Sequence, residues 1–330
     1  MRVAVTGAGG RLGTSLVKKL TEAAAVGEVL AWDLPVHNLD DPLSARRLIT
    51  LHRPDVVIHA AAWTDVDGCA RDPELAMRRN GTAVGEMARA CADAGAAMVV
   101  ISTNEVFDGR RTDGRPYGPT DRPNPGNPYG AAKLAGEAAA RAAYGATGDG
   151  FAAAATAAPA VEVGDAPAVF PTSAAPALAI VRTAWLCGLP GLDFPQKIVA
   201  AAEKARGAGQ TLSLVWDEVG CPTYAPDLGG AIVALIVEWN RPGGRNLGGI
   251  HHIINTGRAS RAEWAREILR LAGIDIATNE VPLSTWPRAS NPPAWGALEP
   301  TPLPGGLLRS WQEAAAEYME LLARKMEAGR

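Results

Sequence analysis

The sequence carries a tyrosine and a lysine at the spacing that brings two side chains onto one face of a helix. Tyr129 and Lys133 lie four residues apart at the start of a helical pattern, and such residues are neighbours on a helix surface. A phenol with an unperturbed pKa near 10 is a poor acid or base at neutral pH. Because a nearby ammonium favours the phenolate, the spacing predicts a general acid whose pKa is lowered towards the working range. The alternative is a surface pair worth a few tenths of a kcal/mol.

Two hydroxyl side chains follow the apolar strand predicted for residues 98–101. They are Ser102 and Thr103, and open parallel sheets bind their ligands at this carboxyl edge. One hydroxyl could hydrogen-bond a substrate carbonyl while Tyr129 protonates it. Taken alone, either hydroxyl could instead hydrogen-bond the backbone groups at the end of the strand. The three residues together predict a site for carbonyl chemistry.

The first thirteen residues contain the glycines that a dinucleotide-binding loop needs. Gly7, Gly10 and Gly13 stand between a short apolar strand, residues 3–5, and a helical pattern. In such a loop the glycines allow a tight turn, close approach of a pyrophosphate and close packing of helix on strand. Asp33, about 20 residues further on, ends a second apolar strand and supplies the acid that this motif requires. The alternative is a glycine-rich turn beside a solvated aspartate.

The elements that must position these residues alternate between strand and helix. The pattern predicts strands at residues 3–5, 29–32, 56–59, 98–101, 179–181, 212–215 and 252–254, and helices at about 12–25, 42–52, 73–94, 129–144, 194–205, 226–239, 261–271 and 310–323. Such alternation is typical of parallel strands joined by right-handed crossovers. We therefore expect an α/β protein with a Rossmann-type doubly wound parallel sheet and a smaller C-terminal α/β substrate-binding domain.

The domain boundaries follow from where the alternation loosens. We expect the dinucleotide-binding domain to contain residues 1–183 and about 225–256, and the substrate-binding domain to contain about 184–224 and 257–330. Residues 145–176 are rich in Ala, Pro, Gly and Thr and poor in charge, which is typical of a low-complexity insertion.

Composition excludes several functions. A net charge of −3 over 330 residues leaves no basic surface for nucleic acid or a membrane. No apolar run reaches membrane-spanning length, and the immediate N-terminal strand does not resemble a signal peptide. The four cysteines are widely spaced, which favours reduced thiols in a cytoplasmic protein. Neither the cysteines nor the histidines have the spacing of a metal site, so we expect no metal.

Taken together, these motifs resemble the extended short-chain dehydrogenase/reductases, and most closely the dTDP-4-dehydrorhamnose reductase family. The shared pattern consists of Thr6-Gly-x-x-Gly10-x-x-Gly13, the Ser102-Thr103 pair and Tyr129-x-x-x-Lys133. Further similarity lies in residues 54–67, 101–109, 127–137, 181–185 and 220–228. These segments span most of the chain.

The resemblance implies an NADPH- or NADH-dependent reduction of the C4 keto group of a nucleotide-linked deoxysugar. It implies that Tyr129 donates the proton, that Thr103 orients the carbonyl and that Lys133 holds the nicotinamide ribose. The cofactor-binding residues that we expect are Gly7, Gly9, Gly10, Arg11, Leu12, Gly13, Asp33, Leu39, Asp40, Ala60, Ala61, Ala62, Ser102, Tyr129 and Lys133. The expected substrate-binding residues are Thr64, Val66, Asn104, Glu105 and Trp185.

Several alternatives stay open at this point. Related dehydratases carry Thr-Asp-Glu where this chain has Thr103, Asn104 and Glu105, and an amide cannot donate a proton as a carboxylic acid does. Dehydration or epimerisation is therefore disfavoured, and a regulatory subunit without catalysis is a further alternative. Asp33 favours NADH, whereas Arg11 in the glycine loop could bind the 2′-phosphate of NADPH. A homodimer is also left open.

Overall fold

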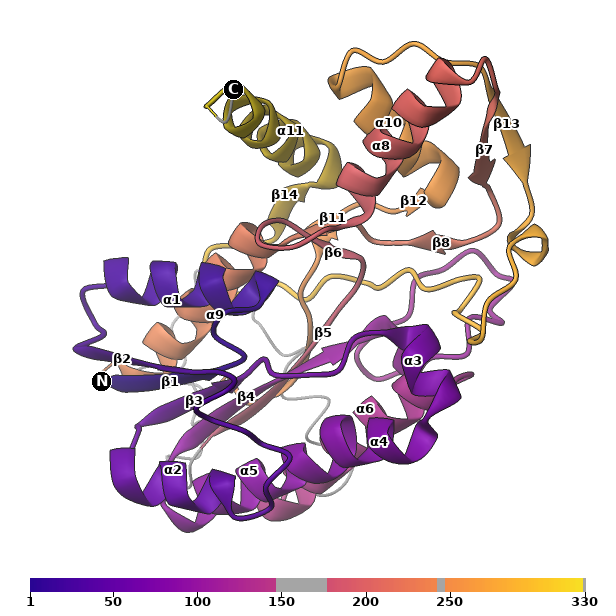
Figure 1. Cartoon of the computed structure of the whole chain (residues 1–330). Coiled ribbons are helices and arrows are strands. Elements are labelled where there is room, and N and C mark those ends of the chain that lie inside the picture. The colour runs from indigo at the N-terminus through magenta and orange to yellow at the C-terminus, as the bar shows by residue number, and fades with distance from the viewer. Residues whose placement is uncertain (147–176, 242–246, 329–330) are drawn as a thin grey trace, which may run out of the picture.

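The computed structural model describes residues 1–146, 177–241 and 247–328 of the chain (Figure 1). Apart from its first two residues, the predicted insertion at residues 145–176 lies outside these ranges. Within the described ranges, no helix combines the length and the apolar character needed to cross a membrane.

A parallel sheet of six strands forms the centre of the larger part of the molecule. Its order is β10-β5-β4-β3-β1-β2, and every neighbouring pair is parallel. The strands are β1 (Arg2–Thr6), β2 (Glu28–Trp32), β3 (Val56–His59), β4 (Ala97–Thr103), β5 (Leu178–Thr183) and β10 (Gly249–His252). This confirms the doubly wound α/β class. The strand order reverses between β1 and β3, which is where such sheets bind their ligands.

Helices cover both faces of this sheet. On one face lie α1 (Arg11–Glu22) and α9 (Ala225–Asn240), and on the other lie α2 (Ser44–His52), α5 (Ala83–Asp93) and α6 (Pro128–Ala143) (Figure 1). Successive residues of β1 point to opposite faces. Val3 and Val5 therefore join the core beneath α1, whereas Ala4 joins the core beneath α2 and α5.

The long helix predicted for residues 73–94 is interrupted. The structure has α4 (Pro73–Met77), a π-helical turn η1 (Arg78–Thr82) and then α5, preceded by an unpredicted short helix α3 (Val66–Arg71). The apolar pattern does not reveal the extra residue of a π turn. The turn packs tightly on α6, since a Cβ atom on Gly136 would lie 2.6 Å from the Asn80 carbonyl oxygen.

The strand predicted for residues 252–254 was placed wrongly. The sheet strand is β10, which ends at His252, and Ile253 and Ile254 are buried in the segment that follows. A run of buried apolar residues looks the same whether or not it joins the ladder, so the sequence could not separate them.

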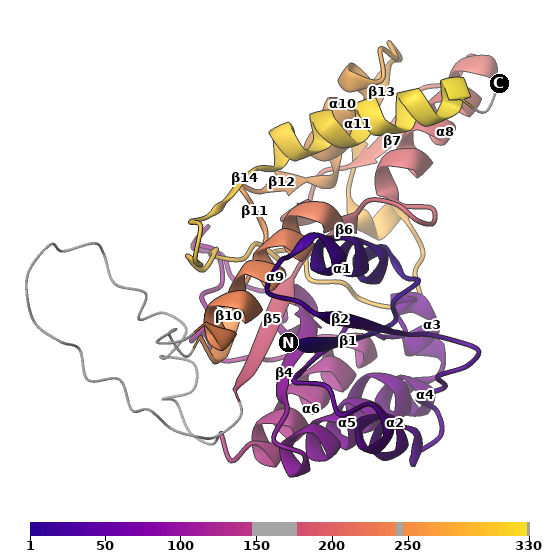
Figure 2. The same ribbon diagram turned by 90° about the vertical axis from the view of Figure 1, so that its left-hand side faces the viewer.

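The smaller part of the molecule is built from four two-stranded sheets, β6-β9, β7-β13, β8-β12 and β11-β14, with three long helices. Figure 2 shows α8, α10 and α11 together at the end of the molecule away from α2 and α5. The strands are β6 (Leu186–Cys187), β7 (Leu212–Val215), β8 (Val219–Gly220), β9 (Thr223–Tyr224), β11 (Asn255–Thr256), β12 (Ala259–Ser260), β13 (Thr278–Val281) and β14 (Leu308–Ser310). The helices are α8 (Phe194–Gly207), α10 (Arg261–Leu271) and α11 (Trp311–Ala328), and η3 (Leu283–Thr285) is a short 3₁₀ turn. A second 3₁₀ turn, η2 (Asn104–Val106), follows β4 in the larger part.

All four cysteines are free and buried. Burial raises the pKa of Cys69 and Cys221 to about 11 and that of Cys91 to about 12. It also raises the pKa of Cys187. These thiols are core residues with little thiolate character at neutral pH.

Candidate active site

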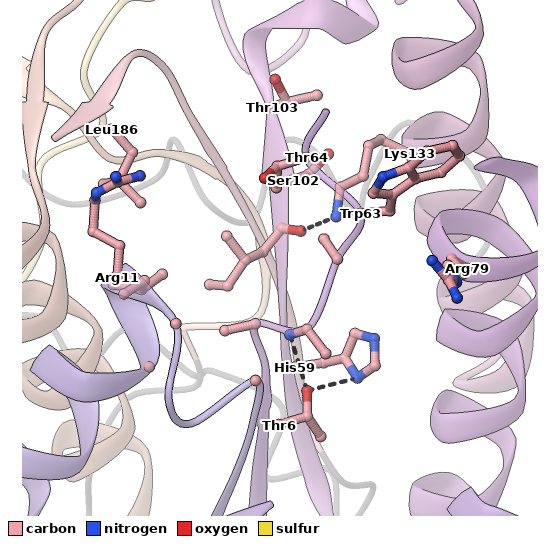
Figure 3. A pocket seen from close by; sticks show the side chains of 18 of the residues that line it. Thr6, Arg11, His59, Trp63, Thr64, Arg79, Ser102, Thr103, Lys133 and Leu186 are labelled. Carbon is pink, nitrogen blue, oxygen red and sulfur yellow. Dashed lines mark hydrogen bonds between the residues drawn. The ribbon is translucent and has the colours of Figure 1, made fainter. Parts of the chain in front are cut away.

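A cavity of about 650 Å³ lies at the carboxyl edge of the sheet, with residues from both parts of the molecule in its wall (Figure 3). Of the predicted site residues, all but Gly9 line it. The cavity runs from the glycine loop after β1 to Tyr129 on α6 and Trp185 after β5. The sheet edge therefore brings the three predicted motifs together.

The glycine loop has the shape that a pyrophosphate requires. Gly7 has a φ of +66°, which favours glycine. A Cβ atom on Gly13 would lie 2.0 Å from the Gly7 carbonyl oxygen, so only glycine allows this approach of helix and loop. Gly10 caps α1 without a side-chain hydrogen bond, so no side chain competes for the first N–H groups of the helix. Such groups bind phosphate oxygens, and the loop fits a dinucleotide.

Asp33 and Arg11 both make contacts within the protein. The Asp33 carboxylate accepts hydrogen bonds from the backbone N–H of Gly9 and from that of Leu34, the latter at 2.8 Å. The Arg11 Nε donates to the Gly188 carbonyl at 2.6 Å and its Nη2 to the Leu192 carbonyl at 3.1 Å. The guanidinium thus joins the glycine loop to the smaller part of the molecule, and its contact with a 2′-phosphate stays a prediction.

Tyr129 begins α6 and is buried, with 9% of its surface exposed. Asn127 caps the helix by accepting a hydrogen bond from the Gly130 N–H at 2.8 Å. Burial raises the pKa of Tyr129 above its ordinary value, and the negative charge of Glu105 adds to this, while hydrogen bonding with Thr103 opposes it. The expected lowering of this pKa is therefore wrong for the structure. The phenol is held in its protonated form, which is the form that donates a proton.

Lys133 lies one turn further along α6, and 4% of its surface is exposed. Its Nζ donates to the Ile101 carbonyl at 2.6 Å (Figure 3). Burial lowers the pKa of Lys133 to about 8, although the charge of Glu137 opposes the shift. The i, i+4 spacing did bring the two side chains into one cavity. The direction of the Tyr129 shift was missed because spacing says nothing of burial.

The Ser102 hydroxyl takes part in a buried network behind the cavity. It donates to Glu137, whose two carboxylate oxygens accept from Arg182 at 3.0 and 2.7 Å. Arg182 and Glu137 are 1% and 2% exposed. This network joins β4, α6 and β5, so Ser102 supports the strand end on which Thr103 stands.

Asn104 and Glu105 tie the site to distant segments. The Asn104 amide donates to the Gly296 carbonyl at 3.2 Å and accepts from the Thr103 hydroxyl at 3.3 Å. Glu105 accepts from the Asn127 amide at 2.6 Å, and burial raises the pKa of its carboxyl group. Asn104 thus holds the segment around Gly296 against the site.

Two arginines in the cavity wall were missed by sequence reasoning. Arg79, on η1, pairs with both oxygens of Asp40 at 2.6 to 3.1 Å. Arg261, the first residue of α10, pairs with Glu218 and lies over the Trp185 ring. In the sequence each is an arginine in a helical pattern, which is typical of a solvated face, so no signal distinguished them.

The histidine at the end of β3 has a structural role. His59 is 1% exposed and hydrogen-bonds with the Thr6 hydroxyl at 3.2 Å, and the same hydroxyl accepts from the Ala61 N–H (Figure 3). Burial and the charge of Lys133 lower the pKa of His59 to about 3, so it is neutral. Among the residues that the structure describes, no group of three or more His, Cys, Asp or Glu side chains could hold a metal ion.

A doubly wound parallel sheet, a glycine loop at its switch point and a Thr–Tyr–Lys set in one cavity define the class. It is that of nicotinamide-dependent oxidoreductases of the short-chain dehydrogenase/reductase type.

Comparisons with known proteins identify the family. The family model described as the RmlD substrate binding domain matches residues 1–147 and 169–324. A dTDP-4-dehydrorhamnose reductase of Mycobacterium tuberculosis is 34% identical over 323 residues, covering 96% of this chain and 91% of that protein. The chain therefore belongs to the dTDP-4-dehydrorhamnose reductase family.

Solved structures agree with this assignment. The dTDP-4-dehydrorhamnose reductase ortholog of Clostridium acetobutylicum has a TM-score of 0.80 at 30% identity, covering 98% of this chain and all of that one. The Bacillus anthracis reductase, solved in complex with NADP, has a TM-score of 0.76 at 26% identity, with 97% of this chain and 98% of that chain covered. The UDP-glucose 4-epimerase of Thermus thermophilus shares the fold at 20% identity.

Proposed function

We propose that the protein reduces the C4 keto group of a nucleotide-linked deoxysugar, in the manner of dTDP-4-dehydro-L-rhamnose conversion to dTDP-L-rhamnose. The observation that carries this proposal is the position of Thr103, Tyr129 and Lys133 in the cavity that the glycine loop also lines. The names of the relatives support the same reaction, since they include a dTDP-4-dehydrorhamnose reductase and a dTDP-4-keto-6-deoxy-D-glucose reductase.

In this proposal each residue has a distinct task. A bound reduced nicotinamide supplies the hydride. The Thr103 hydroxyl donates a hydrogen bond to the substrate carbonyl and orients it. Tyr129, a phenol that is protonated at neutral pH, gives its proton to the oxygen on which negative charge develops. Lys133 would hold the nicotinamide ribose while its ammonium stabilises the phenolate that remains.

The cofactor is NADH or NADPH, and the contacts around Asp33 support a preference for NADH. A carboxylate in this position hydrogen-bonds a ribose 2′-hydroxyl and repels a 2′-phosphate. Two arginines that line the cavity are both engaged within the protein, Arg11 with backbone carbonyls and Arg79 with Asp40. We therefore expect these two arginines to add less binding free energy to the 2′-phosphate of NADPH than the sequence alone suggested.

The division into a dinucleotide-binding and a substrate-binding domain is part of this proposal. The six-stranded sheet draws its strands from residues 2–183 and 249–252. Every strand of the small sheets except β11 lies in residues 184–224 or 257–330, which supports the expected boundaries. A nucleotide sugar would bind between the two, where Trp185, Thr64 and Val66 line the cavity.

The test is turnover of dTDP-4-keto-rhamnose, followed by the absorbance of NADH or NADPH. We expect stoichiometric oxidation of the cofactor by the wild-type protein, with a lower KM for NADH. Tyr129→Phe should lower kcat by about a hundredfold or more, as is typical of the loss of a general acid, while cofactor affinity measured by fluorescence stays nearly unchanged. Turnover without net cofactor oxidation would indicate an epimerase or dehydratase, and unchanged kcat would remove Tyr129 from the mechanism.

A further inference from the structure

Four cations line the cavity, and three of them are committed to partners within the protein. Lys133 donates to the Ile101 carbonyl, Arg11 to two carbonyls, and Arg79 to both oxygens of Asp40. Arg261 differs from the other two arginines because its side chain is bound to a single acceptor atom. Its Nε and Nη2 both donate to a single oxygen, Oε1 of Glu218, at 3.1 and 2.8 Å. Among the described residues, its Nη1 has no hydrogen-bond partner.

The Arg261 side chain is held in place from two sides. The guanidinium carbon lies 3.6 Å from the centroid of the Trp185 ring, which is close stacking. The Trp185 ring also lies against Gly220, where a Cβ atom would be 2.4 Å from the indole. Glu218 is 5% exposed, and its backbone carbonyl accepts a hydrogen bond from the Arg261 backbone N–H at 3.0 Å. The guanidinium is therefore positioned before any ligand binds.

This fixed guanidinium belongs to the substrate end of the cavity. Arg261 lines the same wall as Trp185, Thr103 and Glu105, and its charge acts on the carboxyl group of Glu105, two residues from Thr103. An arginine has five N–H donors in a planar fork that matches phosphate oxygens. Glu218 uses one edge of that fork, so the remaining edge is left for a ligand.

We propose that Arg261, stacked on Trp185 and anchored by Glu218, binds the phosphate group attached to the sugar of the substrate. The inference rests on the proposed function, because it takes the substrate to be a nucleoside diphosphate sugar. The reacting C4 atom and the phosphorylated C1 atom lie on opposite sides of one pyranose ring. With C4 at Tyr129, the sugar-linked β-phosphate is the anion nearest to the catalytic residues. Arg261 lines the same cavity and is stacked on Trp185, and its Nη1 has no hydrogen-bond partner among the described residues.

The test compares two nucleotides that differ by this one phosphate. Calorimetry measures the Kd of dTDP and of dTMP for the wild-type protein and for Arg261→Gln, Arg261→Lys and Arg266→Gln. Arg266 lies on the same helix and pairs with Glu280 on the surface, so its variant is the matched control. Thermal unfolding of each variant checks that it is folded, and Arg261→Lys keeps the charge if Arg261→Gln does not fold.

We expect Arg261→Gln to weaken dTDP binding about 10- to 100-fold, which is the scale of a charge-assisted hydrogen bond. Arg261→Lys should weaken it less, because it retains the charge but not the fork. The affinity for dTMP should change by less than about threefold, and the control should behave as the wild type. The ratio of the two Kd values should therefore collapse in Arg261→Gln.

Three results would overturn the inference: wild-type protein that does not bind dTDP, equal weakening of dTDP and dTMP, or a rise in the Kd of NADH in place of that of dTDP. The last result would assign Arg261 to the cofactor. These measurements need no turnover, so they are distinct from a failure of the proposed reaction, which would show as absent keto-sugar reduction by wild-type protein.

Discussion

Lys133 is a charge inside the protein, and its position has a cost. The ammonium is 4% exposed and has one hydrogen-bond acceptor, the Ile101 carbonyl. Burial lowers its pKa from 10.5 to about 8, which means that the folded state binds this proton less tightly than the unfolded chain does. A group placed for chemistry is expected to reduce stability in this way.

We therefore predict that Lys133→Met is more stable than the wild type at pH 7, by up to about 3 kcal/mol, since each pKa unit corresponds to about 1.4 kcal/mol. The folded-state pKa is depressed, so between pH 8 and 10.5 the unfolded state holds more protons and wild-type stability rises with pH. The advantage of the variant should shrink over that range. Urea unfolding at pH 7 and pH 10 measures it, with the exposed Lys18→Met as control. An advantage that is absent at pH 7, or constant with pH, would contradict the prediction.

At the scale of single residues, the sequence predicted which side chains share the cavity but not their electrostatics. The i, i+4 spacing of Tyr129 and Lys133 is a property of the helix alone. The direction of a pKa shift depends on burial and on neighbours such as Glu105, which only the tertiary structure supplies. Arg261 was missed for the same reason, because its partner Glu218 lies 43 residues away.

At the scale of elements, two glycines inside helices have opposite roles. Gly136 of α6 faces η1, where a Cβ atom would lie 2.6 Å from the Asn80 carbonyl oxygen and 3.2 Å from the Val84 side chain. Gly230 of α9 has no atom within 4 Å of the corresponding position. The first glycine allows two helices to approach, and the second only adds freedom to the unfolded chain.

We predict that Gly136→Ala lowers the free energy of unfolding by about 1–3 kcal/mol, the usual cost of overpacking. Gly230→Ala should raise it by about 0.5–1 kcal/mol, because alanine favours a helix interior over glycine. Denaturant unfolding of both variants compares them directly. Equal shifts in the same direction would show that helix propensity, and not the α6–η1 contact, decides stability at these positions.

Most helices and strands could be predicted, because the period of the apolar residues and the positions of the glycines are properties of the local sequence. The strand at residues 56–59 and the helix at residues 261–271 have the predicted bounds. The π turn and the shift of β10 could not be predicted, since each depends on how one segment packs on another. The two-domain division remains a prediction that the strand order supports.

At the scale of the whole molecule, one segment of the smaller part, residues 288–296, makes side-chain contacts with the larger part. Asp67 on α3 accepts hydrogen bonds from the Ser290 N–H at 3.0 Å and the Ser290 hydroxyl at 2.8 Å, and Arg288 lies 3.4 Å away. Partial burial raises the pKa of Asp67, but the contacts with Ser290 and Arg288 lower it more, so this pKa lies below its usual range. Asn127 and Asn104 bind the same segment through the carbonyls of Asn291 and Gly296.

We predict that Asp67→Ala loosens this segment, because its N-terminal contact is lost while those of Asn127 and Asn104 remain. Hydrogen exchange at residues 286–292 should become several-fold faster, with little change in the six-stranded sheet. Glu74→Gln, an exposed residue of α4, is the control. Unchanged exchange at residues 286–292 would show that the carboxylate does not hold the segment.

The four buried thiols can report local unfolding, because each lies in a different hydrophobic cluster of the molecule. Cys91 lies in the core beneath the sheet, Cys69 beside Tyr129, and Cys187 and Cys221 in the smaller part. A thiol with so little thiolate reacts only when its surroundings separate. The order in which an alkylating reagent marks these cysteines would therefore rank the regions of the molecule by how readily each one comes apart.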